Sequence, residues 1–199
     1  MLRLLAAAAT GYLVGAIPSA DMAVRLATRG ATDIRAAGTG NPGAANVGAV
    51  LGKRWGCGVL VADIGKGAAA SFIGRRIAGD IGAHLGGTAA VVGHCFPAWN
   101  GFHGGKGAAT SSGQCLATFP AYFPVDLGVA YTIAKWRRRP FPATVVASSV
   151  WVLACTAAWR RGWRNGWAPR PSAALPAAAA ASSSVILYRF WAARDRARH

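Results

Sequence analysis

The sequence contains no glutamate, and its acidic residues are six aspartates among 199 residues. Against these stand 22 lysines and arginines, which give a formal net charge of +16. A soluble domain this basic would normally suggest nucleic-acid binding. However, only 14% of the residues are charged, 53% are apolar, and the mean hydropathy is +0.31. This apolar content excludes a disordered chain and indicates an integral membrane protein with basic loops.

Cysteine is also scarce. The four cysteines lie far apart, form no C-x-x-C pair, and sit in apolar stretches: Cys57, Cys95, Cys115 and Cys155. This spacing argues against a small secreted module held by disulfides and offers no zinc pattern. We therefore expect no metal and no cofactor.

Six stretches are apolar and approach the roughly 20 residues that a transmembrane helix needs. They are residues 4–24, 55–73, 79–96, 107–134, 141–159 and 171–188. Residues 107–134 exceed one span and carry Pro120 and Pro124 in the middle, so we predict two short spans there, broken near Phe119. The predicted fold is an all-α, polytopic bundle of about seven transmembrane helices. We expect residues 1–199 to form one integral membrane domain with no separate soluble domain.

The loop charges predict the orientation. Loops on the side of the C-terminus carry about twice as many basic residues as those on the side of the N-terminus. The positive-inside rule then places the N-terminus outside and the C-terminus in the cytoplasm. The basic loop at 160–170 runs against this assignment. The first residues resemble a short signal peptide, but the apolar run continues past any cleavage site, so we expect it to remain as the first span.

A first glycine-rich segment covers residues 33–47 and contains a literal G-x-G-x-x-G. A dinucleotide site would need a strand before this motif, whereas a membrane helix is predicted there. Clustered glycines let backbone N–H groups approach an anion closely. The simpler alternative is a tight turn between helices. The candidate substrate-binding residues of this segment are Arg35, Gly38, Thr39, Gly40, Asn41, Gly43 and Asn46.

A second segment, residues 93–110, ends in Gly-Gly-Lys-Gly and leads into the next apolar stretch. It is not a nucleotide P-loop, because Asn100 stands where the first glycine belongs and Gly107 where Ser or Thr belongs. A lysine between glycines at a helix N-terminus is nevertheless a suitable phosphate clamp. The alternative is an ordinary basic loop residue. The candidates here are Gly104, Gly105, Lys106 and Gly107.

Two charged residues and a histidine fall inside or beside predicted spans. Asp63 and Lys66 are three residues apart, which suits either an ion pair on one helix face or a role in a site. His94 suits either a general base or a packed residue at the membrane interface.

The two glycine-rich segments together resemble the acyl-phosphate-dependent glycerol-3-phosphate acyltransferases, small bacterial inner-membrane enzymes of seven spans. Four family patterns match this chain: G-Y-L-x-G-x-I-P at 11–18, G-S-G-N-x-G-A-x-N-V at 38–47 with Thr39 for its serine, D-x-x-K-G at 63–67, and G-H-x-F-P followed by G-G-K-G-V-A-T across 93–110 with Ala108 for its valine. Two departures stand out. Ala49 takes the place of the arginine that follows the first loop. In the third motif, H-x-x-N-x-x-R, Phe190 and Ala193 replace His and Asn, and Arg196 matches.

This resemblance implies transfer of a fatty acyl group from acyl phosphate to glycerol 3-phosphate, which gives lysophosphatidic acid in phospholipid biosynthesis. It implies a plasma (inner) membrane location with the active site facing the cytoplasm, and no nucleic-acid partner. Both substrates are phosphoanions, so Lys106, Arg35 and the glycine-loop amides would hold them. The catalytic candidates are Lys106, His94 and Thr39, with His94 or a substrate phosphate oxygen taking the proton. Acyl phosphate is already activated, and the chain has no G-x-S-x-G nucleophile elbow.

Two alternatives remain open at this stage. The chain could be an impaired homologue that binds phosphate or lipid and acts as a regulator, or a small anion transporter. The absence of an internal inverted repeat argues against the transporter. If the acyltransferase prediction is right, Thr39, Asn46 and Lys106 should converge on one cleft with Phe190 nearby.

Overall fold

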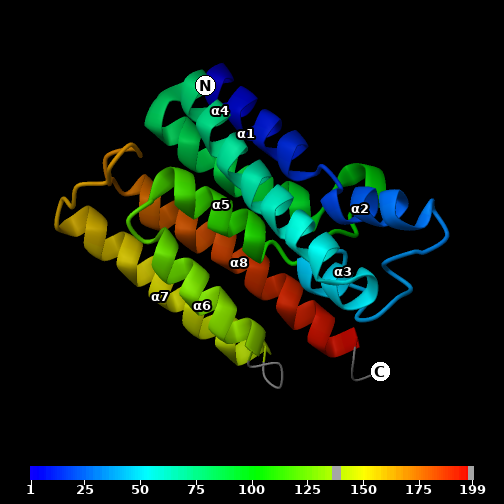
Figure 1. Ribbon diagram of the computed structural model, residues 1–199. Coiled ribbons are helices and arrows are strands. Elements are labelled where there is room, and N and C mark those ends of the chain that lie inside the picture. Colours follow the sequence, from blue (N-terminus) through cyan, green and yellow to red (C-terminus); the bar gives the residue numbers. More distant parts are fainter. Residues whose placement is uncertain (136–139, 197–199) are drawn as a thin grey trace.

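The computed structural model describes residues 1–135 and 140–196, and all regular structure in these ranges is helical (Figure 1). This confirms the all-α prediction. Arg137, Arg138, Arg139 and Arg198, which were counted toward the predicted orientation, lie outside the described residues. The helices are α1 (Leu2–Gly15), α2 (Ser19–Thr28), α3 (Ala44–Leu51), α4 (Lys53–Cys95), the short 3-10 turn η1 (Ala98–Asn100), α5 (Ala108–Thr118), α6 (Phe123–Lys135), α7 (Pro140–Arg160) and α8 (Ala174–Arg196).

The first predicted span, 4–24, is broken rather than continuous. Helix α1 ends at Gly15, and α2 begins only at Ser19. Pro18 precedes α2, and a proline removes a backbone donor and disfavours helical geometry at the residue before it. The chain therefore turns at residues 16–18, which places polar residues of α2 beside the ends of other helices.

Helix α4 is a hairpin of two antiparallel legs. Its non-helical backbone lies at Ala78 and Gly79, and Gly79 takes φ +66°, which a glycine tolerates without strain. The legs approach so closely that a Cβ on Gly86 would overlap the carbonyl of Ala70, and one on Gly74 that of Gly82. The predicted spans 55–73 and 79–96 correspond to these two legs.

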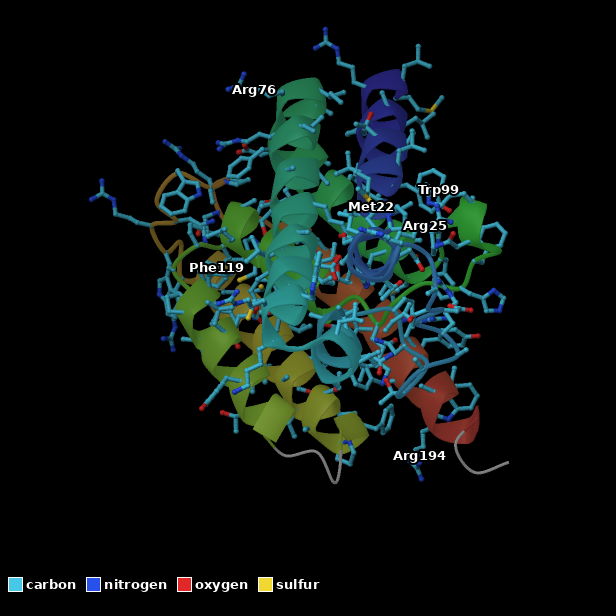
Figure 2. All side chains as sticks on the ribbon, turned by 45° about the vertical axis from the view of Figure 1, so that its right-hand side comes forward. Met22, Arg25, Arg76, Trp99, Phe119 and Arg194 are labelled. Carbon is cyan, nitrogen blue, oxygen red and sulfur yellow. The ribbon has the colours of Figure 1, made fainter. Side chains whose placement is uncertain are left out.

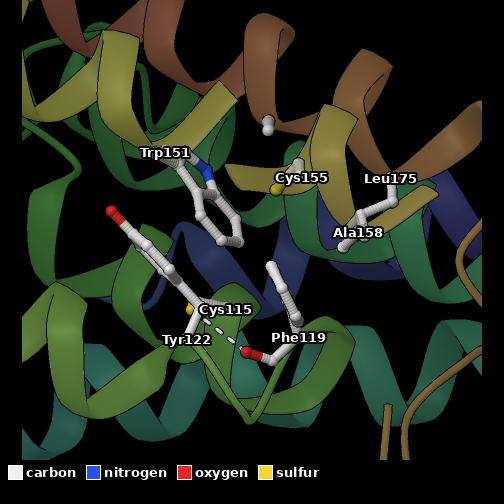
Figure 3. Close-up of a cluster of buried hydrophobic side chains, with 8 residues drawn as sticks. Cys115, Phe119, Tyr122, Trp151, Cys155, Ala158 and Leu175 are labelled. Carbon is white, nitrogen blue, oxygen red and sulfur yellow. Dashed lines mark hydrogen bonds between the residues drawn. The ribbon is translucent and has the colours of Figure 1, made fainter. Parts of the chain in front are cut away.

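The 107–134 stretch forms two helices, α5 and α6, as expected from its prolines. Residues 119–122 separate them, and the backbone turns there around Pro120. Figure 3 shows the aromatic cluster that packs α5 and the turn against α7 and α8. Its buried members are Cys115, Phe119, Tyr122, Trp151, Cys155, Ala158, Leu175 and Ala179.

The bundle has two distinct ends. The N-terminus and the turn of α4 lie at one end, and the end of α8 lies at the other (Figure 1). Arg76 and Arg194 accordingly point outward from opposite ends (Figure 2). Within residues 1–135 and 140–196, three helical segments are long and apolar enough to cross a membrane: Leu2–Thr28, Lys53–Asn100, which includes both legs of α4, and Phe141–Arg160. The count of seven spans and the orientation stay predictions.

Candidate active site

The two glycine-rich segments, far apart in sequence, meet in space. The first connects α2 to α3, and the second connects α4 to α5. Arg35 of the first segment donates through Nη2 to the His103 carbonyl oxygen of the second at 3.0 Å. Gly105 of the second packs against Pro42 of the first. The structure therefore joins the segments that the sequence singled out separately.

Asn46 braces the first segment from inside. It is 2% exposed, and its Oδ1 accepts from the Thr39 backbone N–H at 2.8 Å. Its Nδ2 donates to the carbonyl oxygens of Ile34 at 3.2 Å and Ala37 at 3.0 Å. The amide thus holds the loop that carries Thr39, a role different from the direct substrate contact that we expected of Asn46.

Gly38 is required by that brace, and Gly40 by the turn of the backbone. A Cβ on Gly38 would overlap the Asn46 Oδ1, and Gly38 has φ +59°. Gly40 has φ +68° with its N–H donated to Ala37. Asn41 and Gly43 lead into α3, and the Asn41 side-chain amide lies against Gly43.

Arg35 forms an ion pair with Asp21 of α2 instead of standing free for a substrate. Its Nη1 donates to Asp21 Oδ1 and its Nη2 to Oδ2 at 3.2 Å. Asn100 also donates to Asp21 Oδ2, at 3.1 Å. The hydrogen bond that Arg35 donates to Asp21 raises the pKa of its guanidinium above the ordinary value. We call this set of contacts between Arg35, Asp21, Asn100 and the His103 carbonyl the latch, because it ties α2 to both glycine-rich segments.

Asp63, Lys66 and His94 form a buried cluster of ionisable side chains on the two legs of α4. Lys66 Nζ lies 2.8 Å from Asp63 Oδ1, so the i,i+3 ion pair, one of the two roles that the spacing suited, is present. His94 Nδ1 lies 3.5 Å from the same oxygen. Lys66 also donates to the Ile17 carbonyl oxygen at 3.0 Å, so the cluster reaches the break between α1 and α2.

The backbone of Gly104 and Gly105 is hydrogen-bonded on both sides. Their N–H groups donate to the carbonyl oxygens of Cys95 and His94, each at 3.1 Å. Arg189 of α8 donates through Nε to the Gly105 carbonyl oxygen at 3.1 Å and through Nη2 to that of Gly104. These two amides, which we expected at a phosphate, already have carbonyl partners, so Gly104 and Gly105 instead fix the turn before Lys106.

Lys106 stands at the start of α5. Its Nζ lies 4.5 Å above the centre of the Phe190 ring, so Phe190 is near the lysine as expected. Burial, and then the charge of Arg189, lower the pKa of Lys106 below 10.5. Gly107 follows with φ +85° and precedes α5, whose first N–H groups have no partner within their own helix. Lys106 and this helix end together form an anion-binding geometry.

A small cavity lies where α1, α2, α4 and the two segments meet. Six of the predicted site residues line it: Arg35, Asp63, Lys66, His94, Gly104 and Gly105. It is also lined by Ser19, Asp21, Pro42 and Asn100. The remaining predicted residues are not part of its lining: Gly38, Thr39, Gly40, Asn41, Gly43, Asn46, Lys106 and Gly107. Thr39, Asn46 and Lys106 therefore do not converge on this cavity as expected, and the predicted site is divided between the cavity and the Lys106 helix end, which the Gly104–Gly105 turn connects.

The contacts of two site residues were not predicted from the sequence. Asp21 anchors the latch, and its signal was its rarity, as one of six acids in the chain. Arg189 holds the second segment, and its signal was its place directly before Phe190, a position of the third family motif. The side chain of Arg196 lies outside the described residues. In residues 1–135 and 140–196, no three His, Cys, Asp or Glu side chains are grouped as a metal site.

Comparison with known proteins identifies the family. A family model described as glycerol-3-phosphate acyltransferase matches residues 5–199. The chain is 39% identical over 159 residues to a glycerol-3-phosphate acyltransferase of Allorhizobium ampelinum, across 75% of both chains. It is 42% identical over 141 residues to one of Jannaschia sp., across 69% of this chain and 67% of the relative.

The fold of the chain is similar to a solved structure of the same kind. This is the crystal structure of PlsY (YgiH), an integral membrane glycerol 3-phosphate acyltransferase, in its glycerol 3-phosphate form. The TM-score is 0.77 at 29% identity, across 97% of this chain and 90% of that one. The lysophosphatidic acid form of PlsY has a TM-score of 0.75 at 28% identity. With its two glycine-rich segments joined at one site in an all-helical membrane fold, the chain belongs to the glycerol-3-phosphate acyltransferase family.

Proposed function

We propose that this membrane protein transfers a fatty acyl group from acyl phosphate to the first hydroxyl of glycerol 3-phosphate, giving lysophosphatidic acid. The observation that carries the proposal is the junction of the two glycine-rich segments beside Lys106 and the N-terminus of α5. Membership of the family and the glycerol 3-phosphate form of the similar PlsY structure support the acceptor.

The proposed reaction is a direct acyl transfer. The glycerol oxygen forms a bond to the acyl carbonyl carbon, the bond from that carbon to the phosphate oxygen breaks, and inorganic phosphate leaves with the electron pair. The hydroxyl proton goes to a base, for which His94 or a substrate phosphate oxygen is the candidate. A phosphate leaving group makes a protein nucleophile unnecessary, so catalysis reduces mainly to positioning two phosphoanions against each other.

Each part of the site has its own role in this proposal. Lys106 and the first turn of α5 hold a substrate phosphate, because the ammonium group and the free N–H groups both favour negative charge. Asn46 fixes the loop that presents Thr39. The latch shapes the cavity wall, and His94 lies buried with Asp63 at the cavity.

The site faces the cytoplasm of the inner membrane in this proposal. The C-terminus, the Lys106 segment and the loop between α2 and α3 belong to the side that the loop charges predict as cytoplasmic. An acyl tail would extend between helices toward lipid, while the phosphates stay at the polar end.

A transfer assay tests the proposal. Purified protein in bilayers receives palmitoyl phosphate and labelled glycerol 3-phosphate, and the product is identified as lysophosphatidic acid. Lys106→Ala should lower kcat/KM by about 100-fold or more, the range for removing a preorganised charge-stabilising donor. Lys53→Ala is the matched control, because Lys53 is exposed at the start of α4 and should leave the rate unchanged. Absence of product at every enzyme level would refute the proposed function.

A further inference from the structure

We propose that Arg189 is a positioning residue of the reaction, which holds the Gly104–Lys106 turn from α8 and thereby aims Lys106 at its substrate phosphate. This inference rests on the proposed function. It concerns a residue that directly precedes Phe190, at the place where the chain departs from the third family motif.

The contacts of Arg189 join two elements that are distant in sequence. Its Nε donates to the Gly105 carbonyl oxygen, 84 residues away, and its Nη2 donates to that of Gly104, 85 residues away. The guanidinium also lies 5.3 Å from the centre of the Phe96 ring. A planar fork of donors held over an aromatic ring can fix two neighbouring carbonyls in direction as well as in place, which a lysine cannot do.

Fixing these carbonyls fixes the backbone that carries Lys106. The Gly105–Lys106 peptide is planar and trans, so its N–H points away from the carbonyl that Arg189 binds. The preceding peptide is held on both sides, because the Gly105 N–H donates to the His94 carbonyl oxygen while the Gly104 carbonyl oxygen accepts from Arg189. The Gly104–Gly105 peptide is thus clamped between the end of α4 and Arg189, and Arg189 holds the Gly105–Lys106 peptide at its carbonyl oxygen.

Gly104 and Gly105 leave room for this close packing, and their flexibility is also the reason that the turn needs the contacts of Arg189. A Cβ on Gly104 would overlap the His94 carbonyl, and one on Gly105 would overlap the His94 ring, so both positions are closed to larger residues. Two consecutive glycines, however, leave the turn with a large conformational freedom to lose. Arg189 supplies contacts that select one conformation of this turn.

Arg189 and its neighbour Phe190 together set the surroundings of Lys106. Phe190 lies under the Lys106 ammonium group, and the charge of Arg189 contributes to lowering the pKa of that lysine. Helix α8 therefore contacts both the backbone of the Gly104–Lys106 turn, through Arg189, and the side chain of Lys106, through Phe190. Arg189 and Phe190 of α8 both reach the turn, whereas Ala193 has no polar side chain to offer.

A double-mutant cycle distinguishes positioning through Lys106 from a general loss of structure. Arg189→Gln should lower kcat/KM about 10- to 100-fold, the range for lost hydrogen bonds to a charged group, and should raise the KM of the same substrate as Lys106→Ala does. In the double variant, Arg189→Gln should add less than about threefold to the loss caused by Lys106→Ala, since the two act on one contact. Full additivity, or a loss in kcat alone, would overturn the positioning role.

Chemical rescue supplies a second readout. In Arg189→Ala, a low and non-denaturing concentration of methylguanidinium should restore a measurable part of the lost rate by occupying the vacated position. Arg194→Ala is the matched control, because Arg194 lies on the same helix over the Phe141 ring and should lose little activity and gain none from the additive. Absence of rescue in an Arg189→Ala protein that keeps the wild-type melting temperature would contradict the proposal.

A binding measurement separates this inference from the proposed function. If the wild-type protein turned over no substrate, the proposed function would fail. Stabilisation of the wild-type protein by glycerol 3-phosphate against heating, reduced by Arg189→Gln and not by Arg194→Gln, would then still support the positioning role. Equal stabilisation of all three proteins, or none in the wild type, would overturn it.

Discussion

At the scale of single residues, the protonation of Lys106 is expected to make phosphate binding depend on pH. It lies in a partly buried position, with Arg189 as the charged side chain that acts on it and the Phe190 ring beneath it. Burial and a like charge both disfavour the ammonium form, so the pKa of Lys106 lies below 10.5. A phosphate is bound by the protonated lysine, and binding is therefore lost as the pH rises through this lowered pKa.

This gives a prediction for the pH profile. The kcat/KM of the wild type should fall on the alkaline side at a pH below 10.5. In Lys106→Arg this fall should move to higher pH or disappear, because a guanidinium stays charged throughout the accessible range. The measurement is kcat/KM against pH for both proteins in the same bilayer. The same alkaline fall in both would assign it to another group.

The latch gives a second prediction at this scale. Arg35 was expected to bind a substrate phosphate, yet its guanidinium pairs with Asp21. If Arg35 acts through this pair, Asp21→Asn and Arg35→Gln should each lower kcat/KM by a similar factor of about two to ten, since the pair is partly exposed. The double variant should be no worse than either single one. A larger loss for Arg35→Gln than for Asp21→Asn would show direct substrate binding, and Arg25→Gln, an exposed neighbour on α2, serves as the control.

At the scale of helices, small residues decide how closely the elements pack. A Cβ on Gly11 would overlap Gly86, and one on Gly15 would overlap Ala90, so α1 lies directly on the second leg of α4. Gly67 on the first leg is equally close to the Thr110 carbonyl of α5. In a bilayer, where lipid is as apolar as a leucine side chain, close backbone contact of this kind is a main source of helix association.

A pair of glycines two residues apart tests this packing. Gly67→Ala should destabilise the protein by about 1–3 kcal/mol, the cost of overpacking a tight contact, which corresponds to roughly 2–12 °C in melting temperature for a chain of this size. Gly65→Ala should leave the melting temperature unchanged or raise it, because Gly65 has no neighbour within 4 Å and alanine favours a helix. Thermal unfolding in detergent measures both. Equal effects of the two changes would contradict the packing argument.

Local chemistry made several elements predictable. Pro120 indicated the break between α5 and α6, and an uncharged run of residues indicated α7. Pro18 could have indicated the break between α1 and α2 in the same way, because a proline interrupts a helix, but the apolar residues around it suggested one continuous span. These outcomes follow from backbone geometry and hydropathy, both of which are properties of short segments.

The partners of the site's side chains were not predictable in this way. The glycine-rich segments identified Asn46 and Gly105 as important, but their hydrogen bonds depend on where distant elements meet. Arg189 reaches its carbonyl partners across 84 and 85 residues of sequence, and Arg35 finds Asp21 on another helix. An arginine in a sequence indicates charge, whereas its partner is set by the packing of the whole bundle.

At the scale of the whole molecule, the distribution of charge over the two ends determines the expected orientation. Arg76 and Arg194 mark opposite ends of the bundle (Figure 2). The end of α8 belongs to the more basic side, so it is expected in the cytoplasm. The loop between α7 and α8 is the exception, because it carries Arg161 and Arg164 on the predicted outer side. The side of the membrane on which this loop lies is therefore the most informative test of the predicted orientation.

Cysteine labelling tests it directly. Among the described cysteines only Cys57 is exposed, so Cys57→Ser provides a background with little reactivity. In that background, Arg164→Cys should react with a membrane-impermeant maleimide in intact cells, whereas Ala31→Cys, exposed between α2 and the first glycine-rich segment, should react only after the membrane is opened. The reverse pattern would place the Lys106 site outside. A phosphoanionic substrate supplied from the cytoplasm could then not reach it without crossing the bilayer, and the proposed direction of the site would have to be abandoned even if the transfer assay succeeded.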